Sequence, residues 1–384
     1  MKIVKFIHTA DWHLGKLVHG LYMTEDQRFM LQQFMELVEK EKPDAVIIAG
    51  DLYDRSIPPT DAVNLLDDVL YFINVELNTP ILAISGNHDS AERLSFGSSW
   101  YQKNRFYLNG KIENSFTPVS LGGVNFYLVP YCEPVVVRKL LADDTILNHH
   151  EAMKAIIGKI EDNLNTNEPN VLIGHSFVLG GKTTDSERSL SVGGSGCVGA
   201  ELFAPFSYTA LGHLHSPNAI HHETVKYSGS LMKYSFSEAK QNKSVSIIEI
   251  DEKGSFTQKY HALTPQKDMR ELEGHLEELL DVAYYQHQKV DDYLKITLLD
   301  EGAILDPIQK LRQVYPNVLH LERKIENRDR KEKSLLQVQK DAQKNELELF
   351  ASFYEEMTTA SFTEEKKDWM ESVINKVLRA EGAK

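Results

Sequence analysis

Short apolar runs alternate with longer amphipathic stretches along the first two thirds of the chain. Five runs rich in Val, Ile, Leu and Ala are predicted to be buried strands: 2–7, 44–50, 80–85, 170–174 and 208–212. Three stretches between them carry apolar side chains at helical spacing and are predicted to be helices: 25–42, 60–77 and 149–164. Residues 119–130 and 244–260 have the pattern of hairpins. This order indicates a layered α/β domain with both parallel and antiparallel strand pairs.

The pattern changes near residues 262–268. Residues 271–283 predict an acidic helix, and after them come a strand (293–300), a helix (307–315) and a second strand (317–324). Residues 322–334 are dense in charge and are interpreted as a solvated linker, and residues 345–379 are helical in character. We therefore expect three parts, namely residues 1–262, 263–325 and 326–384.

Polar side chains that can bind a metal ion follow each of the five predicted strands. They are Asp11 and His13; Asp51 and Asp54; Asn87, His88 and Asp89; His175; and His213 and His215. Ligands gather at the carboxyl ends of strands in open α/β sheets, so these five ends can converge on one site. Carboxylate, amide and imidazole ligands without a thiolate suit manganese, iron or zinc and disfavour a structural zinc site. A carboxylate such as Asp51 can bridge two ions, as in phosphoester hydrolysis.

Each of these motifs alone has a simpler interpretation. A strand-end histidine such as His175 is more often a buried polar residue with ordinary hydrogen bonds, and D-x-H or H-x-H alone is weak. The turn Gly86–Asp89 is more specific, because it joins an amide, an imidazole and a carboxylate. The complete set in this order favours a metal site. His149, His150, His221 and His222 lack such spacing and are interpreted as structural or solvated, and Trp12 as a packing residue.

The same motifs resemble those of a known family. "DWHLG", "GDLYDR", "GNHD", "GHS" and "GHLH" are similar to the five signature blocks of the calcineurin-like metallophosphoesterases. "HTADWHLG", "GNHDSAERLSFGS" and "ALGHLH", followed by "YSGSLMKYSFSEAKQNKS", resemble the SbcD family, the nuclease subunits of bacterial SbcCD complexes. The resemblance implies a layered β-sandwich flanked by helices (1–262), a small α+β capping domain (263–325) and a linker with C-terminal helices (326–384).

The resemblance also implies a role for each site residue. Asp11, His13 and His215 would hold one divalent ion, Asn87, His175 and His213 a second, and Asp51 would bridge them, with Mn²⁺ as the expected metal. His88 would act on the scissile phosphate, and Asp89 would orient it. Archaeal relatives carry a histidine where this chain has Asp54, which puts any mechanism that needs two histidines there in doubt. Arg93 is expected either to contact a phosphate or to form a surface ion pair.

The C-terminal segment 361–378 carries an apolar stripe at helical spacing. Its members are Trp369, Met370, Val373, Ile374, Val377 and Leu378. The stripe can pack on its own domain or lie in a groove of a partner. The resemblance favours the partner, which would be the ATPase SbcC, with the capping domain helping to position DNA. The Gly/Ser-rich segment 180–199 can be a substrate loop or a plain connection.

Charge and cysteine content limit the setting. The net charge of −14 argues against a surface broadly attractive to nucleic acid, so DNA contacts are expected in a cleft and in local basic patches. Two cysteines, no apolar run of membrane length and no signal peptide favour the cytoplasm and no membrane association.

The prediction is a two-metal DNA nuclease that works with SbcC in repair and recombination, and is expected as a homodimer. The resemblance implies a 3′→5′ exonuclease on duplex ends and an endonuclease on hairpins and single strands. A phosphoesterase for a small phosphoester or phosphoprotein and a non-catalytic scaffold that binds SbcC are the alternatives.

Overall fold

The computed structural model describes residues 2–187, 196–324, 346–358 and 360–381. Two compact units divide the chain, Met1–Met269 and Arg270–Lys384. Each unit is described by itself.

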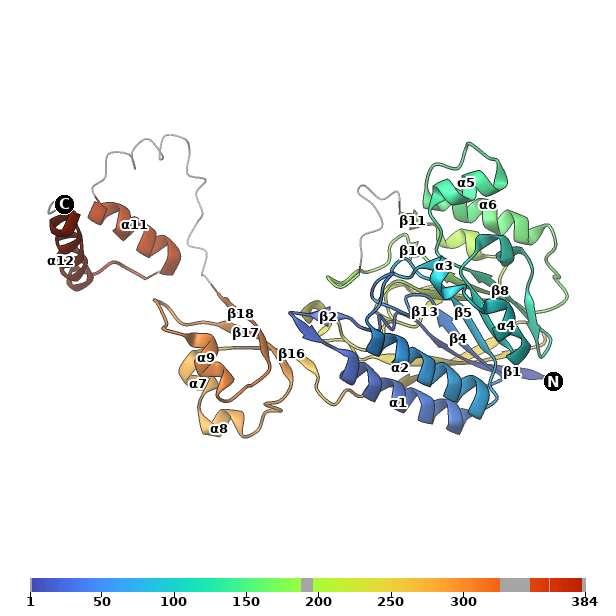
Figure 1. The fold of residues 1–384 in the computed structure, drawn as a ribbon, viewed down its shortest axis with the longest axis horizontal. Coiled ribbons are helices and arrows are strands. Elements are labelled where there is room, and N and C mark those ends of the chain that lie inside the picture. Colours follow the sequence, from blue (N-terminus) through green and yellow to red (C-terminus); the bar gives the residue numbers. More distant parts are fainter. Residues whose placement is uncertain (1, 188–195, 325–345, 359, 382–384) are drawn as a thin grey trace. The chain divides into compact units, whose positions relative to one another are not determined.

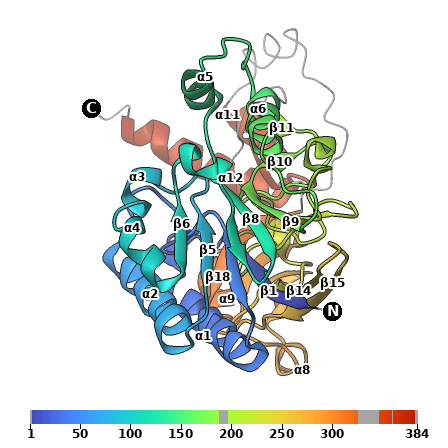
Figure 2. The same cartoon turned by 90° about the vertical axis from the view of Figure 1, so that its right-hand side faces the viewer.

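The first unit contains two large sheets (Figures 1 and 2). The first sheet has the order β15 (Phe256–Ala262), β14 (Ser244–Asp251), β1 (Ile3–Thr9), β4 (Ala45–Ala49), β5 (Ile81–Ile84) and β6 (Phe106–Asn109). The second has the order β13 (Val225–Tyr227), β12 (Tyr208–Gly212), β9 (Asn170–His175), β8 (Val124–Val129) and β7 (Val119–Leu121). β1, β4, β5 and β6 are parallel, as are β8, β9, β12 and β13, whereas β14 pairs antiparallel with β1 and β7 with β8. The five predicted strands and both hairpins are therefore confirmed.

The two sheets pack face to face because alternate residues of their strands form one shared core. Phe6 of β1 meets Phe126 and Tyr208 of the second sheet edge to face, with ring centroids 5.6 Å apart in both pairs. α1 (Thr24–Glu41) and α2 (Thr60–Tyr71) lie along one outer face in Figure 1. α6 (His149–Glu161) covers the outer face of the second sheet, where Ile156 and Leu172 share another core. The result is the predicted sandwich flanked by helices.

Shorter elements connect these layers. They are β2 (Leu17–Val18), β3 (Leu21–Tyr22), α3 (Ala91–Leu94), α4 (Ser98–Tyr101), α5 (Pro134–Leu141), β10 (Phe177–Val178) and β11 (Cys197–Val198). The helix expected over 60–77 changes after Tyr71 into a π-helical turn, Phe72–Glu76.

A three-stranded sheet organises the second unit, in the order β16 (Met269–Gly274), β17 (Tyr293–Leu298) and β18 (Val318–Arg323). Its helices are α7 (Leu276–Leu279), α8 (Val282–Tyr285) and α9 (Pro307–Arg312). The single acidic helix expected over 271–283 is wrong in its first part, because those residues belong to β16. Leu272 packs in the core while its neighbours Glu271 and Glu273 are exposed, an alternation that suits a strand.

Two helices end the described chain, α11 (Glu346–Thr358) and α12 (Glu364–Glu381), as the helical character of 345–379 predicted. Phe350, Tyr354 and Phe362 join them through an aromatic cluster. The side chain of Trp369 is 68% exposed, whereas Met370, Val373 and Ile374 are half-buried. The side chains of Val377 and Leu378, and most of the expected linker over 322–334, lie outside the described residues. None of the described helices combines the length and hydrophobicity needed to cross a lipid bilayer.

His8 is a fully buried titratable residue in the core between the sheets. Its Nδ1 lies 3.0 Å from the hydroxyl of Tyr208, and its Nε2 has no hydrogen-bond partner. Burial lowers the pKa of His8 from 6.5 to about 3. As the pH falls between these values, the unfolded chain binds a proton that the folded chain excludes, so folding becomes less stable.

We expect His8→Gln to weaken this acid sensitivity. One excluded proton lowers the free energy of unfolding by up to about 1.4 kcal/mol per pH unit, and glutamine removes the titration while still offering a polar partner to Tyr208. Urea unfolding of the metal-free protein between neutral and mildly acidic pH measures the slope. The exposed His221→Gln is the control. An unchanged slope in His8→Gln would contradict the assignment.

Candidate metal centre

The polar strand ends converge from both sheets rather than from one. β1, β4 and β5 supply Asp11, His13, Asp51 and Asn87, and β9 and β12 of the facing sheet supply His175, His213 and His215. Two glycines allow this close approach: a Cβ at Gly50 would collide with the His175 ring, and one at Gly212 with the carbonyl oxygen of Ala49. The sandwich therefore closes at this end through direct contacts between the two sheets.

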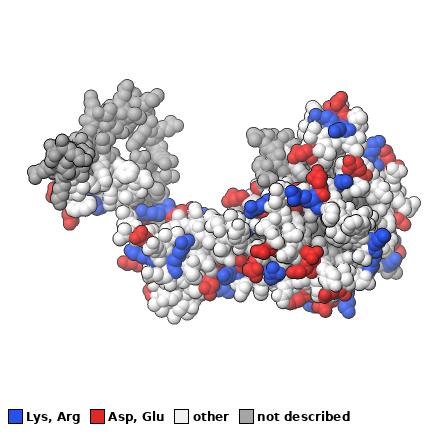
Figure 3. Space-filling model, viewed as in Figure 1, with Lys and Arg blue, Asp and Glu red and all other residues white. Residues whose placement is uncertain are grey.

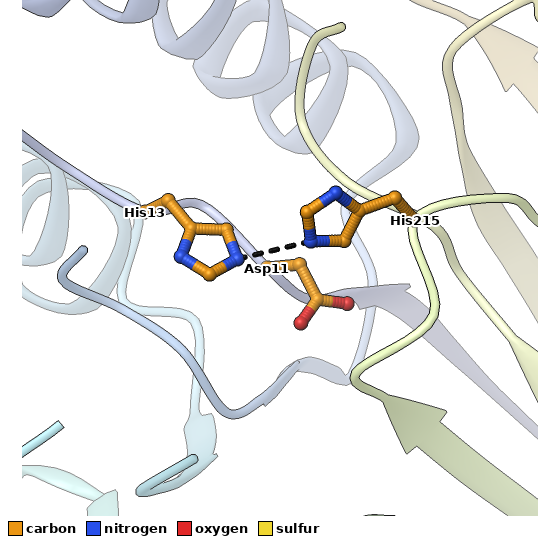
Figure 4. A group of neighbouring side chains, drawn as sticks. All are labelled: Asp11, His13 and His215. Carbon is orange, nitrogen blue, oxygen red and sulfur yellow. Dashed lines mark hydrogen bonds between the residues drawn. The ribbon is translucent and has the colours of Figure 1, made fainter. Parts of the chain in front are cut away.

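Asp11, His13 and His215 form the first group of candidate ligands (Figure 4). All three are buried, and the Nε2 atoms of His13 and His215 lie 3.1 Å apart. The backbone N–H of His213 donates to both carboxylate oxygens of Asp11, at 2.9 and 3.0 Å. These bonds hold the carboxylate of the first sheet against the β12 end of the second.

Asn87, His175 and His213 form the second group. Asn87 Oδ1 lies 3.0 Å from His175 Nε2 and 3.2 Å from His213 Nδ1. The Nδ1 of His175 donates to the carbonyl oxygen of Ala49 at 2.9 Å, which directs its Nε2 toward Asn87. Three potential ligand atoms from three strand ends thus face one point.

Asp51 lies between the two groups. Its Oδ2 is 3.6 Å from His13 Nε2 in the first group and 3.4 Å from His175 Nε2 in the second. Its other oxygen, Oδ1, accepts the backbone N–H of His88 at 2.8 Å. One carboxylate oxygen is therefore fixed by the backbone, while the other is shared by both groups.

These spacings fit metal ions. Ligand atoms about 2.1 Å from an ion and at right angles to each other lie about 3 Å apart. Because the Nδ1 of His175 carries a hydrogen, its neutral Nε2 would turn a lone pair toward the oxygens of Asn87 and Asp51. That arrangement is unfavourable unless a proton or a cation lies among the three atoms. The donor set is thus suited to a divalent cation.

The pKa shifts of the candidate ligands arise from their burial and from the charges of their neighbours. Burial alone would lower the pKa of His175, but the Asp51 and Asp11 carboxylates raise it to about 9. Burial raises the pKa of Asp51, but the combined attraction of His175, His13 and His88 brings it well below the usual range. Burial raises the pKa of Asp11 to about 7 and, with the charge of His175, lowers that of His213 to about 3. Burial likewise lowers the pKa of His13. Positive charge is favoured beside Asp51.

The backbone is strained where these ligands leave their strands. Asp11, His13, Asp51 and His213 have positive φ angles of 52°, 46°, 49° and 103°. Residues with side chains adopt this region rarely, and such strain clusters at functional sites. The left-handed conformation turns each side chain sharply toward the convergence point.

His88 lies at the edge of the centre. Its Nδ1 donates to the carbonyl oxygen of Asp54 at 2.8 Å, and its ring packs edge to face on His13 with centroids 4.7 Å apart. Asp54 pairs with Lys16 at 2.8 Å and lies 3.7 Å from His13 Nδ1. The carboxylate of Asp54 is thus held by a lysine and faces the ring of His13.

Asp89 holds the loops that carry Asp51 and His88. Its carboxylate accepts the backbone N–H groups of Leu52, Tyr53 and Gly86 at 3.1, 2.9 and 2.9 Å. Burial, with the charge of Asp51, raises its pKa to about 7. Asp89 therefore ties the loop after β4 to the loop after β5.

Two other residues singled out in the sequence, Arg93 and Trp12, are not among the candidate ligands. Arg93 is exposed on α3 and lines a cavity along α2 with Tyr53 and Phe96. Trp12 is fully buried against Phe34, which confirms its packing role.

The sequence missed the supporting residues of the centre. Gln27 of α1 donates to the carbonyls of Trp12 and His13 and accepts the N–H of Gly15, so it fixes the turn after β1. Ser186, Glu187, Glu238 and Lys243 surround His215. These contacts join residues distant in sequence, and no local pattern marks them.

Comparisons with known proteins agree with this geometry. Residues 4–217 match the family model described as calcineurin-like phosphoesterase, and residues 265–358 match one described as type 5 capsule protein repressor C-terminal domain. A protein of Staphylococcus epidermidis, named as the SbcD subunit of the nuclease SbcCD, is 36% identical over 379 residues, which cover 99% of this chain and 100% of that protein. The chain belongs to the SbcD family. The family and the fold class expected from the sequence are thereby confirmed.

Solved structures with low identity are also similar. The protein TT1561 of Thermus thermophilus shares 14% sequence identity with this chain and has a TM-score of 0.40. The match covers 67% of this chain and 99% of TT1561. A dimetal phosphatase from Danio rerio shares 11% sequence identity with this chain and has a TM-score of 0.38. The match covers 69% of this chain and 100% of the phosphatase. Metallophosphoesterases such as the SbcD family use divalent metal ions. Among the described residues, three overlapping sets of side chains could hold one: Asp11, His13 and His215; His13, Asp51 and His88; and Asp11, Asp51 and His175.

Proposed function

We propose that the protein is a two-metal DNA nuclease that acts with the ATPase SbcC in DNA repair and recombination. The observation that carries the proposal is the placement of Asp51 Oδ2 within 3.6 Å of a histidine from each ligand group, with His88 beside it. The 36% identical relative, named as part of the nuclease SbcCD, supports DNA as the substrate. The activities proposed are 3′→5′ exonuclease on duplex ends and endonuclease on hairpins and single strands.

Asp11, His13 and His215 would hold one ion, Asn87, His175 and His213 the other, with Asp51 shared. Mixed oxygen and nitrogen ligation suits Mn²⁺, which we propose as the metal. Such a pair of ions supplies an activated water and neutralises charge on the phosphate. The N–H bonds to Asp11 and Asp51 fix these carboxylates before substrate binds.

His88 is proposed as the residue that acts on the phosphate. The Nδ1 of His88 donates to the carbonyl oxygen of Asp54, and in the protonated ring the Nε2–H can donate to a phosphoryl oxygen or protonate the leaving group. Asp89 positions His88 through the loop N–H groups that it accepts. Lys16 and Asp54 form an ion pair at 2.8 Å beside the ring of His13. For Arg93, which is exposed on α3, we propose a phosphate contact, with a surface ion pair as the alternative.

We expect His88→Ala to lose about 100- to 10,000-fold in cleavage rate while keeping both ions. The reason is that His88 bonds to a carbonyl oxygen and Asp51 is held by its backbone N–H, which alanine retains. Mass spectrometry of the native protein gives the metal content, and single-turnover cleavage gives the rate. Loss of one equivalent of metal would make His88 a ligand instead.

One assay separates this function from its rivals. The purified protein with Mn²⁺ is given duplex DNA with a free end, a DNA hairpin and an aryl phosphate. A nuclease cleaves the DNA substrates, an enzyme for small phosphoesters cleaves only the aryl phosphate, and a scaffold cleaves none. Failure to cleave DNA in the presence of SbcC and ATP would overturn the proposal.

The surface charge argues against broad DNA binding, so we propose that DNA contacts are local. Lys/Arg and Asp/Glu atoms are interspersed over the face of the first unit seen in Figure 3, in keeping with the net charge of −14.

We propose that residues 1–262 bind and cut DNA at the metal centre and that residues 263–325 form a cap that positions it. Residues 326–384 would bind SbcC through the stripe of Trp369, Met370, Val373, Ile374, Val377 and Leu378. A cytoplasmic location suits the free thiols of Cys132 and Cys197.

We also propose a homodimer through the face that carries α2 and α4. Large apolar side chains are exposed there, among them Tyr71 (55%), Phe96 (74%) and Trp100 (67%), beside a cavity of about 430 Å³. Such an exposed apolar patch is typical of a protein interface. Light scattering of the purified protein tests this proposal, because a monomeric mass at micromolar concentration would contradict it.

A further inference from the structure

His215 is held at three of its atoms by residues that the ligand motifs do not include. Its backbone N–H donates to Glu187 Oε1 at 2.7 Å, and its carbonyl oxygen accepts from Lys243 Nζ at 2.8 Å. Its ring Nδ1 lies 2.6 Å from Ser186 Oγ. The ring and the backbone of this candidate ligand are therefore fixed independently.

The contact with Ser186, which is half-buried, belongs to a chain of polar groups that continues into the buried Glu238 and Lys243. Ser186 Oγ hydrogen-bonds Glu238 Oε1, and Glu238 Oε2 pairs with Lys243 Nζ at 2.6 Å. Glu238 and Lys243 are only 0% and 4% exposed. Ser235 Oγ also donates to Glu238 Oε1, at 3.0 Å. Ser186, Ser235 and Lys243 thus all donate to the Glu238 carboxylate, as an ionised glutamate requires.

This arrangement fixes which ring nitrogen of His215 carries hydrogen. A serine hydroxyl has one hydrogen, and Ser186 gives it to Glu238. Its oxygen must then accept from His215, so the hydrogen lies on Nδ1. The lone pair is left on Nε2, the atom that faces His13 at 3.1 Å in the first ligand group.

We propose that Ser186 is a positioning residue that, with Glu238 and Lys243 behind it, selects the Nδ1–H tautomer of His215 and aims its Nε2 at the first metal ion. This inference rests on the proposed function, because it takes His215 as a ligand. Partners of this kind behind a ligating histidine raise its basicity and fix its orientation. Ser186 acts through His215 and touches neither ion nor substrate.

The inference also gives a role to part of segment 180–199. Glu187 Oε2 accepts the N–H of Thr184 at 2.6 Å while Oε1 holds His215, so residues 184–187 fold around the ligand. Residues 188–195 lie outside the described part of the chain. The expectation for this segment, a substrate loop or a plain connection, stays a prediction, and its residues 184–187 in addition contact the candidate ligand His215.

Ser186→Ala tests the proposal. We expect the Mn²⁺ affinity of one of the two sites to fall about 10- to 100-fold while the other site is unchanged. Calorimetric titration of the metal-free full-length protein measures both affinities without DNA. Visible absorption on titration with Co²⁺ adds a signature of the ligand field, which should change at one equivalent only. Ser186→Thr keeps the hydroxyl and should restore both readouts.

Ser235→Ala is the matched control, because it removes a hydroxyl from the same Glu238 oxygen without touching His215. Its metal binding should equal that of the wild type. Wild-type affinities in Ser186→Ala, or an equal loss in Ser235→Ala, would overturn the proposal. Suppose the wild type binds two ions and Ser186→Ala lowers the affinity of one site, but neither the wild type nor any variant cleaves DNA. The proposed function then fails and the positioning role stands. If the wild type binds no ion, both fail.

Discussion

Asp51→Asn is expected to lose both metal ions together and to reduce phosphodiesterase activity by more than about 100-fold. Asp51 Oδ2 is the atom shared by the two ligand groups, 3.6 Å from His13 Nε2 and 3.4 Å from His175 Nε2. Asparagine keeps an oxygen that can accept the N–H of His88 but removes the negative charge that both cations share. The side chain keeps its size, so the fold should persist.

Metal content by mass spectrometry and the circular dichroism of the metal-free protein check this result. Asp54→Asn is a control for metal content, because it changes the same residue type in the same loop at a carboxylate that pairs with Lys16. That variant should retain both ions. A folded Asp51→Asn protein with one ion still bound at wild-type affinity would show that the carboxylate does not bridge.

Deletion of residues 345–384 is expected to abolish stable association with SbcC while leaving the metal centre intact. The described ligands all lie between Asp11 and His215, in the first unit. Manganese-dependent cleavage of a generic phosphodiester should therefore continue, and ATP-dependent processing of DNA ends should stop. Burial of each large apolar side chain contributes about 1.5–3 kcal/mol before ordering is subtracted, so loss of several removes most of the binding energy.

Trp369→Ala combined with Ile374→Ala is the milder form of this experiment. Trp369 is 68% exposed, so its removal should weaken the complex without unfolding the chain. Lys367→Ala removes an exposed polar side chain of the same helix, one that pairs only loosely with Glu364 at 3.5 Å, and should leave binding unchanged. Copurification of the truncated chain with SbcC at wild-type stoichiometry would show that the tail packs on its own unit instead.

The buried strands of the first unit were predictable because parallel strands covered on both faces form continuous apolar runs. The convergence of the candidate ligands was predictable for the same reason, since each follows such a run directly. What the runs could not show is that β1, β4 and β5 lie in one sheet and β9 and β12 in another. Sheet membership depends on pairing between distant segments, and the hydrophobic pattern of one strand does not encode it.

Two other features were hidden for different reasons. β16 was missed because Leu272, Leu276 and Leu279 follow helical spacing, while the strand alternation covers only a few residues. Ser186 and Glu238 were missed because their hydrogen bond joins residues 52 positions apart. A buried polar chain of this kind has meaning only once the backbone has brought its members together.

The division of the ligands between two sheets has a consequence for how the protein is made. Asp11, Asp51 and Asn87 leave the ribosome well before His213 and His215, and β14, which pairs with β1, is not complete until Asp251. At about 5–20 residues per second, roughly 10–50 s separate the synthesis of Asp11 from the end of β14. Until His213 and His215 emerge, the nascent chain presents Asp11 and His13 of the first group and only Asn87 and His175 of the second. We therefore expect high-affinity metal capture only after the sandwich has closed, and no competent metal centre in a chain that stops short of the second sheet.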